Sequence, residues 1–255
     1  MRRTGMTSEF IDRVAIITGG ASGIGAEVAR QLLDLGARVA VLDLHVESAD
    51  PRGLAISADV SDSASVQAAI AEVVAQYGGI DILVNNAGIG AQGSVEVVDD
   101  AEWARVLSVN VTGMARVASA ALPWLRASPT ASIVNVASIA ATAGLPQRAL
   151  YSASKGAVLA LTRAMAADHL ADGVRVNCVN PGTADTPWVG RLLATAPDPD
   201  AERAALAARQ PHGRLVSMGE IAQAILYFAS PGAGSTTGAS LAVDGGMQNL
   251  RMRTP

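Results

Sequence analysis

Charge, histidine and cysteine are scarce in this sequence of 255 residues, and each shortage narrows the possible functions. Only 16% of the residues are charged and the formal net charge is −4, with no basic run, so nucleic acid is not an expected partner. A single cysteine, Cys178, excludes an internal disulfide, and its apolar neighbours predict a buried, inert thiol. The three histidines lack the spacing of metal ligands, so no metal site is predicted.

Long apolar runs are also missing. No stretch reaches the roughly 18 uninterrupted apolar residues of a membrane span. Charged residues near Met1 are not followed by the apolar core of a signal peptide, so we expect a cytoplasmic protein with no membrane partner. Lysine is the scarcest charged residue. Of nineteen basic residues only Lys155 is lysine, which raises the question of what arginine cannot do at that position.

Short apolar runs alternate with helical patterns along the whole chain, which predicts one domain over residues 1–255. The runs are nearly continuous, as in parallel strands that are buried on both faces, and they fall at 14–17, 38–42, 54–56, 80–84, 132–136, 174–179 and 240–243. Helices are expected at 24–35, 63–77, 101–126, 151–170 and 218–229. This alternation predicts an α/β fold, a Rossmann-type doubly wound parallel sheet of about seven strands.

Sequence signals also mark the ends of elements and one irregular segment. Asp62 and Ser217 are expected helix N-caps, and glycines follow three of the helices, at positions 36, 78 and 173. Residues 187–214 contain several prolines around a short alanine-rich helix. Because this segment lies late in the chain, between a strand and a helix, we expect it to form a substrate loop or lid.

A glycine-rich turn follows the first predicted strand and opens a helix. Such glycines let the backbone turn tightly and approach a pyrophosphate, whose charge the free N–H groups of the new helix attract. The residues assigned to this role are Gly19, Ser22, Gly23, Ile24 and Gly25. Their spacing differs from the commoner Gly-x-Gly-x-x-Gly, so a purely structural glycine turn is the competing interpretation, although strand, turn and helix occur in the required order.

The second predicted strand ends at Asp43, about eighteen residues beyond the last glycine. A carboxylate at that place can accept hydrogen bonds from the adenosine ribose and would repel a 2′-phosphate. No basic residue stands in the glycine turn or directly after Asp43, where Leu44 follows. The pattern therefore favours NAD over NADP, with a plain surface aspartate as the alternative.

Tyr151 and Lys155 lie four residues apart on a predicted helix, so they share one face. A free tyrosine has a pKa of about 10, and a neighbouring cation, with a pyridinium cofactor beside it, favours the phenolate. Ser138 lies at the carboxyl end of the fifth strand, where such sheets bind ligands, and can hydrogen-bond a substrate oxygen while Tyr151 moves the proton. Taken alone, a Tyr-x-x-x-Lys pair is usually solvated on a helix surface.

Together these residues resemble the short-chain dehydrogenase/reductase family, in its short single-domain branch. The matching elements span residues 11–246 in family order and comprise Thr18–Gly25, Asp59-Val60, Asn85-Asn86-Ala87-Gly88, Asn110, Ser138, Tyr151, Lys155, Pro181-Gly182 and Thr186. One departure is the short stretch between Asp43 and Asp59, where we expect the usual helix to be reduced to a turn.

The resemblance implies a role for each catalytic position. Tyr151 would be the acid/base and Ser138 the hydroxyl that orients the substrate. Lys155 would lower the pKa of the tyrosine and bind the nicotinamide ribose, and Asn110 would hold a water that links Lys155 to solvent. Arginine could not replace Lys155 without loss, because its planar group is bulkier and differently hydrated.

The resemblance also implies cofactor contacts and an assembly. Asp59 and Val60 would surround the adenine, and Asn86, Ala87 and Gly88 would follow the adenosine side. The segment against the nicotinamide would comprise Pro181, Gly182, Thr183, Ala184 and Thr186. Asn85 is expected to make a structural bond between strands instead. A homotetramer is expected by family analogy.

Arginines near the expected site point to an acidic substrate. Arg148 precedes Tyr151, and Arg191, Arg203 and Arg209 lie in the expected lid. Arginine binds carboxylates through two parallel hydrogen bonds, although an arginine-rich protein also scatters this residue over its surface. The segment after Pro181 resembles 2-keto-3-deoxy-L-fuconate dehydrogenases and cytosolic type-2 3-hydroxybutyrate dehydrogenases. That resemblance implies Arg148 and Arg209 as carboxylate ligands and Trp188 as a lid wall.

Three other functions compete with a dehydrogenase of sugar acids or short hydroxy acids. A 3-oxoacyl-type carbonyl reductase shares the catalytic residues, but such enzymes usually prefer NADP. A catalytically silent NAD-binding regulator would be expected to lose Tyr151 or Lys155, and both are present. An epimerase of the larger related type needs a sizeable C-terminal substrate domain, for which 255 residues leave no room.

Overall fold

Seven parallel strands form one sheet in the computed structural model, which describes residues 9–252. Their order across the sheet is β3-β2-β1-β4-β5-β6-β7. The strands are β1 (Val14–Thr18), β2 (Arg38–Asp43), β3 (Leu54–Ser57), β4 (Ile82–Asn85), β5 (Ser132–Val136), β6 (Arg175–Pro181) and β7 (Ser240–Val243). This doubly wound sheet confirms the predicted fold class and the seven strands.

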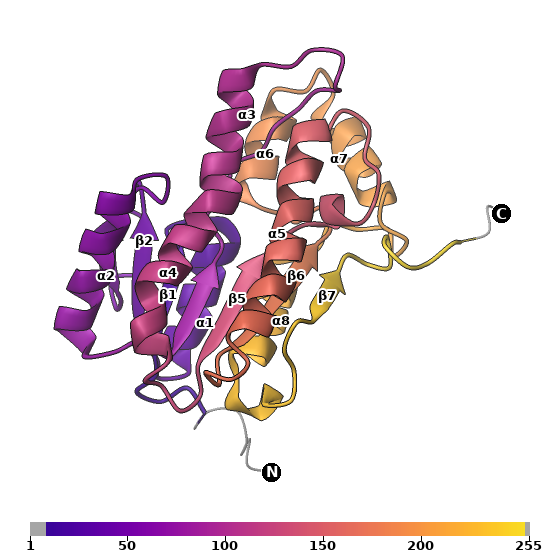
Figure 1. The fold of residues 1–255 in the computed structure, drawn as a ribbon. Helices are drawn as coiled ribbons and strands as arrows, with labels where there is room; N and C mark the ends of the chain where they lie inside the picture. Colours follow the sequence, from indigo (N-terminus) through magenta and orange to yellow (C-terminus); the bar gives the residue numbers. More distant parts are fainter. Residues whose placement is uncertain (1–8, 253–255) are drawn as a thin grey trace, which may run out of the picture.

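Helices cover both faces of the sheet (Figure 1). They are α1 (Gly23–Asp34), α2 (Ser63–Tyr77), α3 (Asp100–Leu107), α4 (Gly113–Leu125), α5 (Ala149–Asp168), α6 (Pro187–Ala194), α7 (Pro199–Ala208) and α8 (Met218–Ala229). Shorter turns are η1 (Ser108–Thr112), η2 (Ile139–Ala141) and η3 (Pro231–Ala233). No helix within residues 9–252 is long and apolar enough to cross a membrane.

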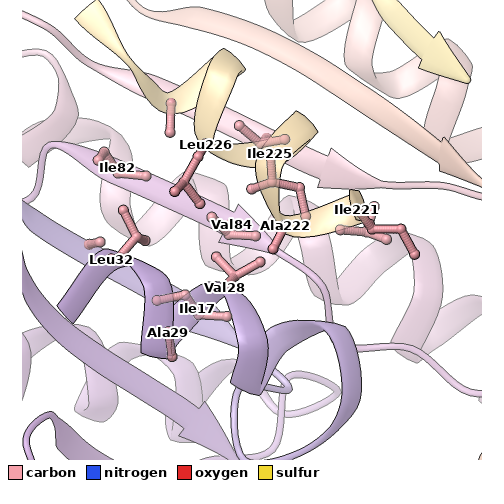
Figure 2. Packing of buried hydrophobic residues seen from close by; sticks show 14 of the residues in the cluster. Ile17, Val28, Ala29, Leu32, Ile82, Val84, Ile221, Ala222, Ile225 and Leu226 are labelled. Atoms are coloured by element: carbon pink, nitrogen blue, oxygen red, sulfur yellow. The ribbon is translucent and has the colours of Figure 1, made fainter. Parts of the chain in front are cut away.

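Two apolar cores hold these layers together. On one face, Leu32 of α1 and Ile225 of α8 pack with Ile17 and Val84 of the sheet (Figure 2). On the other face, α2, α4 and α5 cover the residues of the same strands that point the opposite way, such as Ile16 and Leu83. Alternate strand residues therefore enter opposite cores, which explains why the strand sequences are apolar almost without interruption.

The sheet order reverses between β1 and β4, because β2 follows β1 to one side and β4 returns to its other side. At such a reversal the loops after neighbouring strands diverge and leave a crevice at the carboxyl ends. The glycine turn leaves β1 and the segment 86–93 leaves β4 at this place. The fold thus brings the two predicted cofactor segments together.

Three of the predicted helix ends are confirmed, two by side-chain caps and one by a left-handed glycine. Asp62 accepts a hydrogen bond from the backbone N–H of Ala64, and Ser217 forms a capping box with Glu220. Gly78 ends α2 with a φ of 83°, a left-handed conformation that favours glycine. Local sequence is sufficient here because each cap involves residues that are close in the chain.

Two segments differ from the helix predictions, and a third agrees with them. The helix predicted over 101–126 consists of α3 and α4, separated by the π turn η1. Residues 187–214 contain two helices instead of one, because Thr186 caps α6 and Pro187 occupies its first turn. The connection between β2 and β3 contains no helix, which confirms the predicted reduction to a turn.

Candidate functional site

A cleft of about 600 Å³ opens at the carboxyl ends of β1, β4, β5 and β6. Most of the predicted site residues line it, namely Ser22, Ile24, Asn86, Gly88, Ser138, Arg148, Tyr151, Lys155, Pro181, Gly182, Thr183, Ala184, Thr186, Trp188 and Arg209. The structure therefore brings together the glycine turn, the Tyr-x-x-x-Lys helix and the expected lid. The predicted residues outside the lining are Gly19, Gly23, Gly25, Asp43, Asp59, Val60, Ala87 and Asn110.

The glycine turn is packed against the segment that follows β4. Asn86 Nδ2 donates hydrogen bonds to the carbonyl oxygens of Thr18, at 3.0 Å, and Gly19, at 2.9 Å. A Cβ at Gly25 would collide with the carbonyl oxygen of Gly19, and Gly19 itself has a φ of 62°. Glycine is required at both positions, and the first turn of α1 is left facing the cleft with backbone N–H groups free for an anion.

Asp43 is fixed beside this turn at the end of β2. Its Oδ2 atom accepts a hydrogen bond from the backbone N–H of Ala21 at 3.1 Å, and its Oδ1 atom accepts one from His45 at 3.3 Å. The carboxylate is therefore held at the edge of the glycine turn before any ligand arrives. This is the place that the sequence predicted for an acceptor of ribose hydroxyls.

Asp59 and Val60 follow β3 at the same edge of the sheet. Asp59 accepts a hydrogen bond from the backbone N–H of Ser61 at 2.7 Å, and its own N–H donates to Ser65 Oγ at 2.9 Å. Val60 packs against Gly113 of α4, where a Cβ would lie 3.0 Å from the valine side chain. These contacts build a turn, and adenine recognition by it stays a prediction.

Ser138 and Tyr151 meet at the centre of the cleft. Ser138 follows β5, where its hydroxyl accepts a hydrogen bond from the N–H of Ala140 at 3.1 Å, and it lines the cleft together with Tyr151. Burial raises the pKa of the Tyr151 phenol, whereas Ser138 and the charge of Arg148 lower it. Burial outweighs both neighbours in the protein without cofactor, and the lowering expected from Lys155 and a bound cofactor stays a prediction.

Lys155 lies below Tyr151 and is only 4% exposed. Its Nζ atom donates a hydrogen bond to the carbonyl oxygen of Val136 at 2.9 Å and lies 5.8 Å from the centre of the Tyr151 ring. Burial lowers the pKa of the ammonium to about 8, against a smaller opposing effect of Cys178. The unique lysine of the chain is therefore a buried group beside the predicted acid/base.

Asn110 lies in the π turn η1 and is fully buried. Its Oδ1 atom accepts a hydrogen bond from the N–H of Ile89 at 2.8 Å, and Nδ2 donates to the carbonyl oxygen of Ile89 at 2.9 Å. A Cβ at Gly88 would lie 3.3 Å from Asn110 Oδ1 and 3.4 Å from Lys155 Nζ, so both polar groups lie close to this backbone. The predicted neighbourhood of Asn110 and Lys155 is present, and the relay water stays a prediction.

Arg148 is anchored at the wall of the cleft. Its Nη1 atom donates to the carbonyl oxygen of Ala91 at 3.3 Å. The backbone on either side of it is bound to Gly93, which accepts from the N–H of Ala149 and donates to the carbonyl oxygen of Gln147, both at 3.1 Å. Arg148 is thus held in place by the segment that follows β4.

The lid residues meet the same segment. Trp188 of α6 lies over Gly90, where a Cβ would come within 3.2 Å of the indole, and it is about half exposed. Arg191 and Arg209 line the cleft, and neither forms an ion pair with any residue among 9–252. In contrast, Arg203 pairs with Asp185 at 2.7 Å and Arg214 with Glu220 at 2.6 Å.

Arg191 is a cleft residue that the predicted site did not include. The sequence placed it in the lid, but nothing in the sequence distinguishes it from Arg203, which turns out to be paired outside the cleft. The three arginines of the cleft, Arg148, Arg191 and Arg209, face no acidic side chain in its lining within residues 9–252. This part of the cleft therefore carries cationic side chains without a carboxylate in the lining, which suits an anion.

Two residues that the sequence assigned to structural roles have them. Asn85 Nδ2 donates to Asn135 Oδ1 across β4 and β5 at 2.9 Å, which confirms the predicted bond between strands. Cys178 is fully buried in β6, and burial raises the pKa of its thiol. A buried thiol with a raised pKa is inert, as predicted.

Comparisons with known proteins agree with this geometry. A family model described as enoyl-(acyl carrier protein) reductase matches residues 19–248. The cis-4-hydroxycyclohexanecarboxylate dehydrogenase of Sinomonas cyclohexanicum is 42% identical, over 94% of this chain and 98% of that protein. The 2-keto-3-deoxy-L-fuconate dehydrogenase of Xanthomonas campestris pv. campestris is 38% identical, over 92% of this chain and 79% of that protein.

A solved structure is similar over nearly the whole fold. The ligand-free aldohexose dehydrogenase of Thermoplasma acidophilum superimposes with a TM-score of 0.91 and 33% sequence identity, over 97% of this chain and 99% of that one. The family match and these relatives agree with the arrangement of Ser138, Tyr151 and Lys155 in the cleft. The chain belongs to the short-chain dehydrogenase/reductase family of oxidoreductases.

Proposed function

We propose that this protein is an NAD-dependent dehydrogenase that interconverts a secondary alcohol and a ketone on a substrate that carries a carboxylate. The observation that carries the proposal is the composition of one cleft. Ser138, Tyr151 and Lys155 lie together at its base, and arginines without acidic partners line its mouth. The first group moves a proton on an oxygen, and the second binds an anion.

Proton transfer is the task of Tyr151. In alcohol oxidation its phenolate accepts the hydroxyl proton of the substrate, and in ketone reduction the phenol returns it. Ser138 donates a hydrogen bond to the same substrate oxygen. With a pKa of about 8, the ammonium of Lys155 keeps its proton at neutral pH and makes the phenolate less costly. A nicotinamide cofactor, when bound, takes or gives the hydride at the neighbouring carbon.

The residues present fit a dinucleotide. Gly19 and Gly25 keep the turn after β1 free of side chains, and the first turn of α1 offers unpaired N–H groups to a pyrophosphate. Lys155 Nζ lies close enough to Gly88 to bond a ribose hydroxyl placed along that segment. Asp43, held by Ala21 and His45, supports NAD, because its charge repels a 2′-phosphate.

The substrate class follows from charge. Arg148 and Arg209 were expected to bind a carboxylate, and Arg191 joins them in the same cleft. Guanidinium groups without an ion pair keep their hydrogen-bond donors for a ligand. The Sinomonas relative is named for a hydroxycarboxylate and the Xanthomonas relative for a keto sugar acid, which supports a sugar acid or a short or cyclic hydroxy acid.

The lid function of residues 187–214, the cytoplasmic location and the homotetramer stay predictions. The contact of Trp188 with Gly90 supports the lid function. For the homotetramer, the edge strand β7 leaves Leu241 39% exposed and neighbouring Tyr227 of α8 51% exposed, so an apolar sheet edge is available to a partner.

Gly25→Ala tests the cofactor turn. We expect NADH to bind at least tenfold more weakly, because the new methyl group must displace the carbonyl oxygen of Gly19. The measurement is a fluorescence titration with NADH, with circular dichroism to confirm folding. Gly79→Ala is the matched control, since its Cβ would have no atom within 4 Å. Equal NADH affinity for both variants would contradict a binding role for this turn.

Tyr151→Phe tests the chemistry. The wild-type protein is assayed for NADH formation with hydroxy acids, sugar acids and matched neutral alcohols, with NADP in parallel. We expect acids to be oxidised with NAD. Tyr151→Phe should lose at least a thousandfold in kcat while its affinity for NADH changes little, because only the proton acceptor is removed. Turnover of neutral alcohols alone, or with NADP alone, would refute the assignment of the arginines or of Asp43.

Arg148→Ala tests the carboxylate site. Its KM for an acid should rise at least tenfold, and its KM for the neutral alcohol of the same shape should change less than twofold. Arg203→Ala is the control, because that arginine is also exposed, in the expected lid, but pairs with Asp185. Steady-state kinetics on the acid and its neutral analogue decide the matter. An equal rise of KM for both substrates would show that Arg148 shapes the cleft without binding the anion.

A further inference from the structure

Ser154 has a buried hydroxyl group that the proposed chemistry does not use. It lies in the first half of α5, directly before Lys155, and is completely inaccessible to solvent. Its Oγ atom donates a hydrogen bond to the carbonyl oxygen of Tyr151 at 2.8 Å and accepts one from Asn110 Nδ2 at 3.1 Å. One side chain thus connects the helix of Tyr151 and Lys155 with the π turn of Asn110.

The amide of Asn110 is held from two sides. Ile89, in the segment after β4, binds both ends of it through the backbone N–H and carbonyl oxygen. The second Nδ2 hydrogen is left for Ser154. These bonds join three elements that bear on the reaction, namely the cofactor segment after β4, the turn η1 and the helix α5.

A hydroxyl is needed at this position for a physical reason. The backbone groups within a helix are paired with one another, so only a side chain of α5 can accept a hydrogen bond from a neighbouring element. Alanine would leave a buried N–H of Asn110 without a partner, which the protein can avoid only by moving the amide. Asn110 Oδ1 and Lys155 Nζ both lie within 3.4 Å of the position that a Cβ on Gly88 would take. A movement of the Asn110 amide therefore changes the surroundings of the ammonium.

We propose that Ser154 is a positioning residue, which acts through Asn110 to fix the surroundings of Lys155 during proton transfer. Ser154 itself does not line the cleft, so its effect reaches the reaction only through the residues to which it bonds, Asn110 and Tyr151. This inference rests on the proposed function for its kinetic consequences. Its structural consequence, a change at Lys155, is independent of that function.

The test is Ser154→Ala, with Ser152→Ala as the matched control from the same motif. Within residues 9–252 the Ser152 hydroxyl forms no hydrogen bond, so its removal should leave activity as in the wild type. For Ser154→Ala we expect a kcat at least tenfold lower, a displaced pH profile of kcat/KM, and an affinity for NADH within twofold of the wild type. If Ser154→Ala folds badly, Ser154→Cys replaces it in the test. The thiol is of similar size but accepts hydrogen bonds poorly, so this variant should show the same changes in kcat and pH profile.

A double-mutant cycle with Asn110→Ala separates positioning from a general loss of stability. If Ser154 acts through Asn110, the double variant should be no slower than Asn110→Ala alone, because the partner is already gone. Multiplied losses would overturn the proposal. An unchanged kcat and pH profile in Ser154→Ala, with only the melting temperature lowered, would also overturn it.

A readout without turnover keeps this inference apart from the proposed function. Because the chain has one lysine, labelling lysine with ¹³C at Cε gives a single NMR signal from Lys155. Its titration midpoint should move by at least half a pH unit in Ser154→Ala and stay in place in Ser152→Ala. If the wild-type protein oxidises no substrate, the proposed function fails while this shift still supports the role of Ser154. An unchanged midpoint refutes that role.

Discussion

The burial of a single ammonium group governs the arrangement of this site. Lys155 is closed off by the end of β5 and by the segment after β4, and within residues 9–252 its Nζ atom has one hydrogen bond, to Val136. Burial destabilises the charged form of this group, and its pKa is therefore lowered. The Nζ atom lies 5.8 Å from the centre of the Tyr151 ring, and in such surroundings little water screens its charge. We propose that the bulkier guanidinium of arginine could not replace it without loss, which would account for a lysine in a chain that otherwise uses arginine.

The fold supplies these surroundings from parts that are distant in the sequence. The reversal of strand order between β1 and β4 opens the crevice, and the eight residues from Asn86 to Gly93 connect its functions. Along this segment, Asn86 supports the glycine turn, Ile89 holds Asn110, Gly90 lies below the lid tryptophan, and Gly93 fixes the backbone around Arg148. The parts proposed for the cofactor, for proton transfer and for the substrate therefore contact one short stretch of backbone.

What the sequence could predict was local or periodic. Apolar runs gave the strands, the glycine turn followed from its place between strand and helix, and Tyr151 and Lys155 share a face because they are four residues apart. The π turn at Asn110 was missed because it depends on packing between α3, α5 and the segment after β4. The rise of the Tyr151 pKa through burial could not be predicted either, because burial is a tertiary property. Arg191 could not be told from Arg203, since the partner of Arg203 is known only in three dimensions.

The titration of Lys155 in the unliganded wild-type protein tests the central claim most directly. With lysine labelled by ¹³C at Cε, one NMR signal reports one group, and its chemical shift is followed from pH 6 to 11. A buried ammonium with a single hydrogen bond should titrate with a pKa of about 8. A midpoint near the ordinary lysine value of about 10.4 would show that the group is solvated or otherwise paired, and would contradict this account of the site.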